Sequence, residues 1–138
     1  MKTIYTAVVT ATGGRNGHVV SSDRIIDLPV ALPEGLGGKG GSTNPEQLFA
    51  AGYASCFQSA LLVVAGSKHV HFATDSTVTA HVDLNKHDDG SYGLGVTLDI
   101  DLKGFDKEEG RKFVEEAHRI CPYSVGTRGN IDVKMNVR

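Results

Sequence analysis

The most regular pattern of hydrophobic and polar positions lies in the second half of the chain. Apolar and polar residues alternate over residues 78–84 and again over residues 94–102, with a turn at Asp88-Asp89-Gly90 between them. Alternation with a period of two places the apolar side chains on one face of a strand. These runs predict a long antiparallel hairpin with one buried face. Residues 131–137 repeat the alternation and predict another half-buried strand.

The N-terminal third predicts shorter strands. Residues 3–12 are rich in Thr, Val, Ile and Tyr, the glycine-rich residues 13–17 follow as a turn, and residues 18–22 resume strand-like composition. This order predicts a hairpin with Arg15 at its tip. Residues 28–33 predict a further extended piece, which two prolines interrupt.

The start of a first helix is clearly marked. Asn44 can cap it, Pro45 suits the first helical position, and Gln47 stands three residues after the cap. The helix is predicted to run to about Ser67 and to contain Cys56.

A capping box at residues 106–109 predicts the start of a second helix. Pro122 disfavours helical dihedrals at the preceding residue and predicts the end of this helix. The helical spacing predicts an inward stripe of five residues: Phe113, Val114, Ala117, Ile120 and Cys121. Together the elements predict an α+β fold in which helices pack on largely antiparallel sheet, within a single domain of residues 1–138.

Residues 47–67 of the first predicted helix carry no charge and approach the length of a membrane span. Small and polar residues dilute the segment and no basic flank frames it, so we interpret it as a buried central helix. Its apolar residues point in nearly every direction. Each Leu or Phe left exposed costs about 1.5–3 kcal/mol, which favours a homodimer that covers them.

Composition excludes several classes of partner. The net charge of −2 and the pI of about 6.3 argue against nucleic acid and anionic membranes. A secretory signal pattern is missing and two cysteines form no disulfide framework, so we expect a cytoplasmic protein. The glycine-rich residues 35–43 lack the lysine that a phosphate-binding loop needs after Gly40. No nucleotide cofactor is expected.

Cys56 is the first candidate for chemistry, although a helical cysteine among apolar residues fits an inert core position equally well. Apolar surroundings raise the pKa of a thiol, so a reactive Cys56 needs a cation that stabilises its thiolate. Arg15 is a candidate cation, or else a solvated turn residue. Glu46 could pair with Arg15, or could simply complement the helix N-terminus.

Cys121 allows a structural interpretation and a metal-binding one besides a redox role. His118 and Cys121 share a helical face, and Cys56 could join them as a ligand. A zinc site usually needs closely spaced pairs of ligands, but only one such pair is present here, and His69 and His71 lie on a different segment. The spacing therefore favours no metal.

Three motifs carry a resemblance to a known family. Residues 44–57, Asn-Pro-Glu-Gln-Leu-Phe-Ala-Ala-Gly-Tyr-Ala-Ser-Cys-Phe, resemble the signature around the reactive cysteine of the organic hydroperoxide resistance (Ohr) proteins in the Ohr/OsmC family. Residues 11–17 resemble the arginine loop of that family. Residues 121–124 with 127–131 resemble its second-cysteine motif. The motifs occur in family order, and the resemblance extends over essentially the whole chain.

The resemblance implies the OsmC-like fold and an intertwined homodimer that acts as a peroxidase in antioxidant stress response. In this chain Cys56 would be the peroxidatic and Cys121 the resolving cysteine, joined in a redox-active disulfide. Arg15 would hold the thiolate and Glu46 would orient Arg15. The family is recycled by dihydrolipoamide or a lipoylated protein, and the resemblance implies no cofactor.

A pocket of Phe49, Tyr53 and Val63 around Cys56 would favour organic over hydrogen peroxide, because each buried methylene contributes about 0.8 kcal/mol. Alkyl and fatty-acid hydroperoxides are therefore the expected substrates. An alternative function is a peroxide-responsive redox sensor without turnover.

Overall fold

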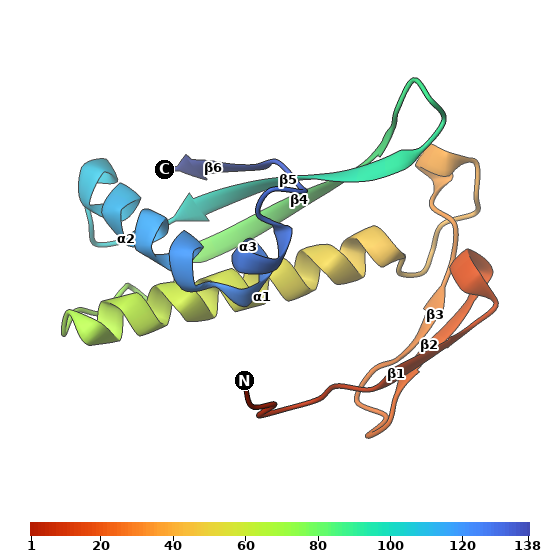
Figure 1. The fold of residues 1–138 in the computed structure, drawn as a ribbon, viewed down its shortest axis with the longest axis horizontal. Helices are drawn as coiled ribbons and strands as arrows, with labels where there is room; N and C mark the ends of the chain where they lie inside the picture. The colour runs from red at the N-terminus through yellow and green to blue at the C-terminus, as the bar shows by residue number, and fades with distance from the viewer. The chain divides into compact units, whose positions relative to one another are not determined.

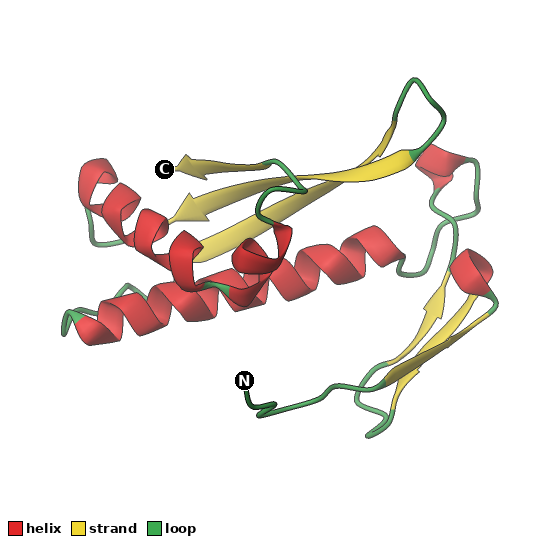
Figure 2. Cartoon of the chain, viewed as in Figure 1, coloured by secondary structure: helices red, strands yellow, loops and turns green.

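The structure is a computed structural model that describes residues 1–138 (Figures 1 and 2). The chain forms two compact units, Met1–Leu48 and Phe49–Arg138. The first unit contains β1 (Val9–Thr12), η1 (Gly14–Asn16), β2 (Gly17–Ser21), β3 (Asp27–Val30) and η2 (Glu34–Leu36). Helix α1 (Pro45–Ser67) begins in the first unit and continues in the second. The second unit also contains β4 (Thr77–Lys86), β5 (Tyr92–Asp101), α2 (Lys107–Ile120), α3 (Pro122–Thr127) and β6 (Val133–Val137). The single domain predicted from the sequence stays a prediction.

Strands β1, β2 and β3 form an antiparallel sheet in the order β1-β2-β3. The turn between β1 and β2 depends on glycine. Gly13 has a φ of 74°, and a Cβ on Gly17 would lie 1.8 Å from the carbonyl oxygen of Thr12. A larger residue at either position would strain or block the turn. The predicted hairpin with Arg15 in its connection is therefore confirmed.

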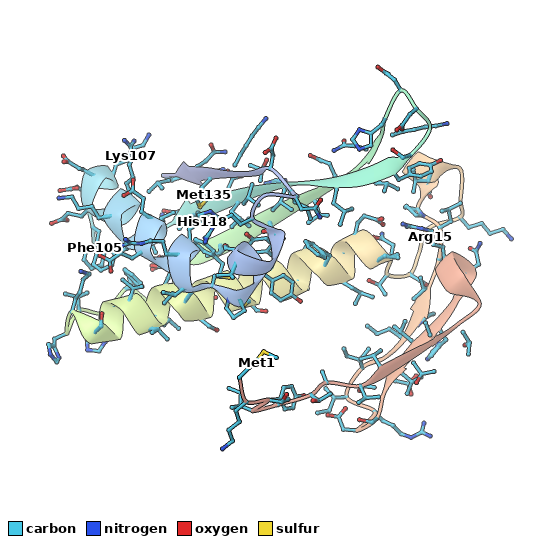
Figure 3. All side chains as sticks on the ribbon, in the orientation of Figure 1. Met1, Arg15, Phe105, Lys107, His118 and Met135 are labelled. Atoms are coloured by element: carbon cyan, nitrogen blue, oxygen red, sulfur yellow. The ribbon has the colours of Figure 1, made fainter.

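The predicted first strand, residues 3–12, is wrong in length. Only Val9–Thr12 is a strand, and Met1 lies in an extended segment with exposed side chains (Figure 3). The reason is the lack of a partner. Strand β2 ends at Ser21, opposite Val9, and the chain then turns, so no neighbouring strand within the sheet extends alongside residues 1–8.

The second sheet has the order β4-β5-β6. Strands β4 and β5 form the predicted antiparallel hairpin, in register from Thr77↔Asp101 to Lys86↔Tyr92. Strand β6 pairs parallel to β5, because the helices α2 and α3 return the chain to the same end of the sheet before β6 begins. The prediction of largely antiparallel sheet is confirmed, with this one parallel pair.

Helices α1 and α2 pack on one face of this sheet and enclose the core of the second unit (Figure 1). The opposite face carries the polar residues of the alternating strands, as predicted. The side chains in the core with less than 2% exposure include Tyr53, Phe57, Leu61, Leu98, Ile100 and Val114. At the end of α1 the core is closed by three aromatic rings, Phe72, Phe105 and Phe113, with centroids 5.1–5.3 Å apart.

The predicted cap of α2 is confirmed. The Asp106 carboxylate accepts from the Glu109 backbone N–H at 2.9 Å, and the Glu109 carboxylate accepts from the Asp106 N–H at 3.3 Å. The predicted burial of Cys121 is also confirmed, since its side chain is 0% exposed. Ile120, predicted on the same stripe, is 49% exposed. At about 100° per residue it lies about 60° from the centre of the stripe, at its edge.

Helix α3 is not predicted by the sequence pattern. Cys121 has extended dihedrals, and Pro122 then occupies the first position of a new short helix. The proline that ends α2 therefore also begins α3. Because α3 is only six residues long, its sequence has too few turns for a periodic signal.

Helix α1 has one buried and one exposed face. It is apolar and long enough to cross a membrane, a property that core helices of globular proteins share. Tyr53, Phe57 and Leu61 lie in the core of the second unit, which is the packing of a core helix. On the exposed face, Leu62 and Val63 are 58% and 63% exposed. The prediction of a buried central helix therefore holds for one face only.

Candidate active site

The two cysteines of the chain lie side by side in the second unit. Cys56 is in the middle of α1, and Cys121 is the residue between α2 and α3. Both are free thiols, and their Sγ atoms are 3.7 Å apart. A disulfide bond is about 2.05 Å long, so only a small movement of the two side chains would join them.

The two thiols differ in their access to solvent. Cys121 is fully buried, whereas Cys56 is partly exposed. Cys56 is therefore the thiol that a small molecule from solution meets first. Cys121 can react only with the neighbouring sulfur of Cys56. This arrangement suits a pair in which Cys56 reacts first with the substrate and Cys121 then reacts with Cys56.

Burial is the main influence on the Cys56 thiol and raises its pKa above the ordinary value of 9.0. A hydrogen bond from the backbone N–H of Tyr123 opposes this effect, and the neighbouring Cys121 adds to it. The thiolate is the reactive form of cysteine. A reactive Cys56 near neutral pH therefore requires a positive charge that offsets the cost of burial.

Aromatic rings surround this part of α1. The ring centroids of Phe49 and Tyr53 are 6.2 Å apart, and Tyr123 lies 5.7 Å from the first and 5.4 Å from the second. The structure thus brings Phe49 and Tyr53 together and adds Tyr123. Val63, two turns beyond Cys56 in the exposed face of α1, is not in this cluster. Its place in a substrate pocket stays a prediction.

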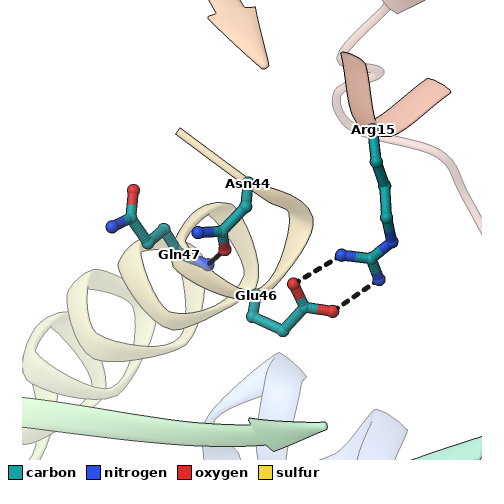
Figure 4. A network of polar contacts seen from close by, with 4 residues as sticks. All are labelled: Arg15, Asn44, Glu46 and Gln47. Carbon is teal, nitrogen blue, oxygen red and sulfur yellow. Dashed lines mark hydrogen bonds and ion pairs between the residues drawn. The ribbon is translucent and has the colours of Figure 1, made fainter. Parts of the chain in front are cut away.

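In the first unit, Arg15 and Glu46 form a bidentate ion pair (Figure 4). The Nη1 and Nη2 atoms of Arg15 donate to Oε2 and Oε1 of Glu46 at 2.8 and 2.6 Å. The side chain of Glu46 is 15% exposed and that of Arg15 is 36% exposed. The Arg15 hydrogen bond lowers the pKa of Glu46, and the same bond raises the pKa of Arg15. Both side chains are therefore held charged.

Local sequence explains the position of each member of the pair. Arg15 is presented by the glycine turn between β1 and β2, and Glu46 lies in the first turn of α1. The side chain of Asn44 accepts from the Gln47 backbone N–H at 2.9 Å and caps the helix (Figure 4). Bidentate contacts of this kind restrict the orientation of the guanidinium.

His118 does not complete a metal site with the cysteines. No three His, Cys, Asp or Glu side chains are grouped in a way that could hold a metal ion. His118 lies on α2 (Figure 3), where its buried Nδ1 atom has no hydrogen-bond partner. Burial and the nearby Arg128 lower its pKa, which favours the neutral ring.

Two residues of this site are missed by sequence reasoning. Tyr123 contributes its ring and its backbone N–H, and the Oγ atom of Ser124 lies 2.8 Å from the Tyr53 hydroxyl. The sequence signal that could have indicated them is Pro122. A proline suits the first position of a helix, so it could have predicted α3, which holds both residues next to Cys121.

The fold and the paired cysteines define the class of this protein, and comparisons with known proteins agree. The sequence model of the OsmC-like protein family matches residues 38–136. The organic hydroperoxide resistance protein OhrA of Bacillus subtilis is 50% identical over 97% of this chain and 96% of its own length. The protein of the same name from Xanthomonas axonopodis pv. citri is 46% identical over 99% and 96%.

Solved structures lead to the same assignment. OhrB of Bacillus subtilis superposes with a TM-score of 0.89 at 44% identity, covering 99% of this chain and 100% of the other. An organic hydroperoxide resistance protein of Legionella pneumophila gives a TM-score of 0.91 at 46% identity, with 97% of each chain covered. The chain therefore belongs to the OsmC-like family, and within it to the organic hydroperoxide resistance proteins.

Proposed function

We propose that this protein is a cysteine-based peroxidase that reduces organic hydroperoxides to alcohols and so protects the cell against them. The central observation is the pair of thiols at 3.7 Å, of which one is partly exposed and the other is buried. The names of the relatives, organic hydroperoxide resistance proteins, support the substrate class.

The chemistry proceeds in two steps. The Cys56 thiolate attacks the terminal oxygen of the peroxide, an S–O bond forms, the O–O bond breaks, and the leaving alkoxide takes up a proton to become the alcohol. Cys56 is thereby oxidised to a sulfenic acid. The Cys121 thiol then attacks the Cys56 sulfur, an S–S bond forms, and the sulfenic oxygen leaves as water.

In this proposal Arg15 supplies the positive charge that the partly buried Cys56 thiolate needs, and it polarises the peroxide. Glu46 orients Arg15 as a positioning residue. The bidentate geometry supports this role, because a guanidinium held by two hydrogen bonds presents its remaining donors in a defined direction.

The aromatic cluster supports a substrate with an apolar tail. Phe49 and Tyr123 offer partly exposed rings that an alkyl or fatty-acid chain can cover, and we propose that Val63 extends this wall. Tyr53, predicted to line the pocket, packs behind these rings with its side chain fully buried, so it supports the wall without reaching the substrate. Three buried methylenes would contribute about 2.4 kcal/mol, which exceeds a factor of ten in affinity. Hydrogen peroxide gains nothing from such walls.

An external dithiol completes the cycle, and we propose dihydrolipoamide or a lipoylated protein of the cytoplasm. Its thiolate attacks the sulfur of Cys56, the less buried of the two cysteines, and displaces the Cys121 thiolate. The second thiol of the reductant then breaks the mixed disulfide. Two electrons and two protons pass from the dithiol to the protein, and the dithiol becomes a cyclic disulfide.

Sustained turnover tests the proposed function. Cumene hydroperoxide should be consumed in many equivalents per protein when dihydrolipoamide is supplied, and more rapidly than hydrogen peroxide at equal concentration. A redox sensor without turnover, the alternative function, would consume about one equivalent and stop. Such a result would contradict the enzyme proposal.

Replacement of Arg15 by alanine should slow the peroxide step roughly a hundredfold, a typical effect of removing one charge-stabilising donor. The variant should also need a higher pH to reach the same rate, because without Arg15 no positive charge offsets the burial that raises the pKa of Cys56. Below that pKa the fraction of thiolate, and with it the rate, rises about tenfold per pH unit. Stopped-flow measurement of the second-order rate against pH checks this. Lys39→Ala, which removes an exposed charge of the same unit, is the matched control, and an unchanged rate in Arg15→Ala removes Arg15 from the mechanism.

We also propose a homodimer, because apolar side chains of α1 and of the N-terminal segment are exposed. Leu62, Val63 and Ile4 are examples. Val63→Glu should weaken the dimer, since a carboxylate would replace an apolar group in the covered surface. Sedimentation equilibrium at micromolar concentration checks this, with Thr79→Glu on the polar face of β4 as the control. A monomeric wild-type chain contradicts the proposal.

A further inference from the structure

A second contact links the two segments that carry the cysteines. The hydroxyl of Tyr53 and the Oγ atom of Ser124 are 2.8 Å apart, and both side chains are completely buried. Tyr53 precedes Cys56 by three residues in α1, and Ser124 follows Cys121 by three residues in α3. The two contacts, Tyr53 to Ser124 and Cys56 to Cys121, therefore lie about one helical turn apart.

Gly52 adds a third contact in the same register. A Cβ at this position would lie 2.3 Å from the hydroxyl oxygen of Tyr123, so only the absence of a side chain allows the tyrosine to lie this close to α1. Residues 52, 53 and 56 of α1 thus face residues 123, 124 and 121, respectively. Figure 1 shows the short helix α3 beside α1 at this point.

The three contacts differ in how they respond to the reaction. During the proposed cycle the contact between the two sulfurs changes from a thiol pair to a sulfenic acid beside a thiol and then to a disulfide. The bond between Tyr53 and Ser124 involves no redox-active atom. It can persist through every state, and breaking it would leave two buried hydroxyl groups without partners.

We propose, on the basis of the proposed function, that Tyr53 and Ser124 are positioning residues. They hold the Cys121 segment against Cys56 while no disulfide joins the two cysteines. Their hydrogen bond sets the rate at which Cys121 captures the sulfenic acid. It thereby decides the competition between capture, which releases water, and attack by a second hydroperoxide, which yields a sulfinic acid and a second alcohol.

The test measures this competition in the purified full-length protein. Tyr53→Phe and Ser124→Ala each remove one hydroxyl and little volume. In either variant, the concentration of cumene hydroperoxide that converts half of Cys56 to sulfinic acid should fall about threefold to tenfold, the effect of one net hydrogen bond. Mass spectrometry measures the fractions of disulfide and sulfinic acid. The rate of the first peroxide step should change less than about twofold, because neither hydroxyl contacts a sulfur.

The double variant, Tyr53→Phe with Ser124→Ala, separates positioning from stability. Removing both partners leaves no unsatisfied hydroxyl, so its melting temperature should recover toward that of the wild type. Its over-oxidation should remain as high as in the single variants. Thr127→Val is the matched control, because the Thr127 hydroxyl donates only to backbone carbonyl groups of its own helix, at 2.9 and 3.2 Å. This control should lose stability without a change in over-oxidation.

Two results would overturn the inference. The first is a wild-type ratio of disulfide to sulfinic acid in single variants that fold normally. The second is a double variant in which this ratio returns to the wild-type value together with the melting temperature. These outcomes differ from a failure of the proposed function. A wild-type chain that consumes no hydroperoxide contradicts the peroxidase itself, whereas normal wild-type turnover beside unaffected variants contradicts only the role of Tyr53 and Ser124.

Discussion

Replacement of Cys56 by serine should reduce organic hydroperoxide consumption to the uncatalysed background, a loss of at least about a thousandfold. The hydroxyl of serine is not ionised near neutral pH and is a far weaker nucleophile toward a peroxide oxygen than a thiolate. Cys121 cannot take over the reaction, because its side chain is fully buried. Peroxide consumption in the presence of dihydrolipoamide measures the effect.

A nearby serine supplies the control for this variant. Ser59 lies on the exposed face of α1, one turn beyond Cys56, and its hydroxyl donates only to the backbone oxygen of Ser55. Ser59→Ala should therefore consume peroxide at the wild-type rate. Residual activity of Cys56→Ser above a few per cent of wild type would show that the primary nucleophile lies elsewhere.

Replacement of Cys121 by serine should preserve the first reaction of Cys56 but remove its protection. In the wild type a thiol 3.7 Å away competes with any second peroxide molecule. The effective concentration of such a neighbour greatly exceeds millimolar substrate or external thiol. The peroxide concentration that inactivates half of the protein should fall at least about a hundredfold in this variant, and inactivation should coincide with formation of Cys56 sulfinic acid.

Two measurements distinguish this expectation from a general loss of structure. The second-order rate of the first oxidation should stay within a few-fold of wild type, since Cys121 raises rather than lowers the pKa of Cys56. Intact-mass spectrometry should show sulfinic acid and no intramolecular disulfide. If Cys121→Ser withstands peroxide as well as the wild type, Cys121 is not the resolving residue.

Much of the fold follows from local sequence signals. The caps at Asn44 and Asp106 define where two helices begin, and period-two alternation defines the hairpin of β4 and β5. Such signals depend on side chains a few residues apart, so they need no knowledge of the tertiary structure. The errors occur where contacts with distant residues determine an element. The first strand is short because β2, its pairing partner, ends opposite Val9, and α3 is too short to have a periodic pattern of its own.

The site divides in the same way. The residue types and motif order pointed to two cysteines, an arginine in a glycine turn and a carboxylate in the first turn of α1. The contacts among them depend on tertiary packing. Cys56 and Cys121 are 65 positions apart and Arg15 and Glu46 are 31 apart, so no local pattern encodes either distance.

The sequence by itself determined the main helices and strands, the family resemblance and the candidate residues, because each of these is recorded in short-range patterns. Only the tertiary structure decided that one thiol is partly exposed and the other buried, that Tyr123 joins the aromatic cluster, and that Tyr53 meets Ser124. The physical reason is the packing of the junction between α2 and α3 against α1, where burial, shape and hydrogen bonding act together.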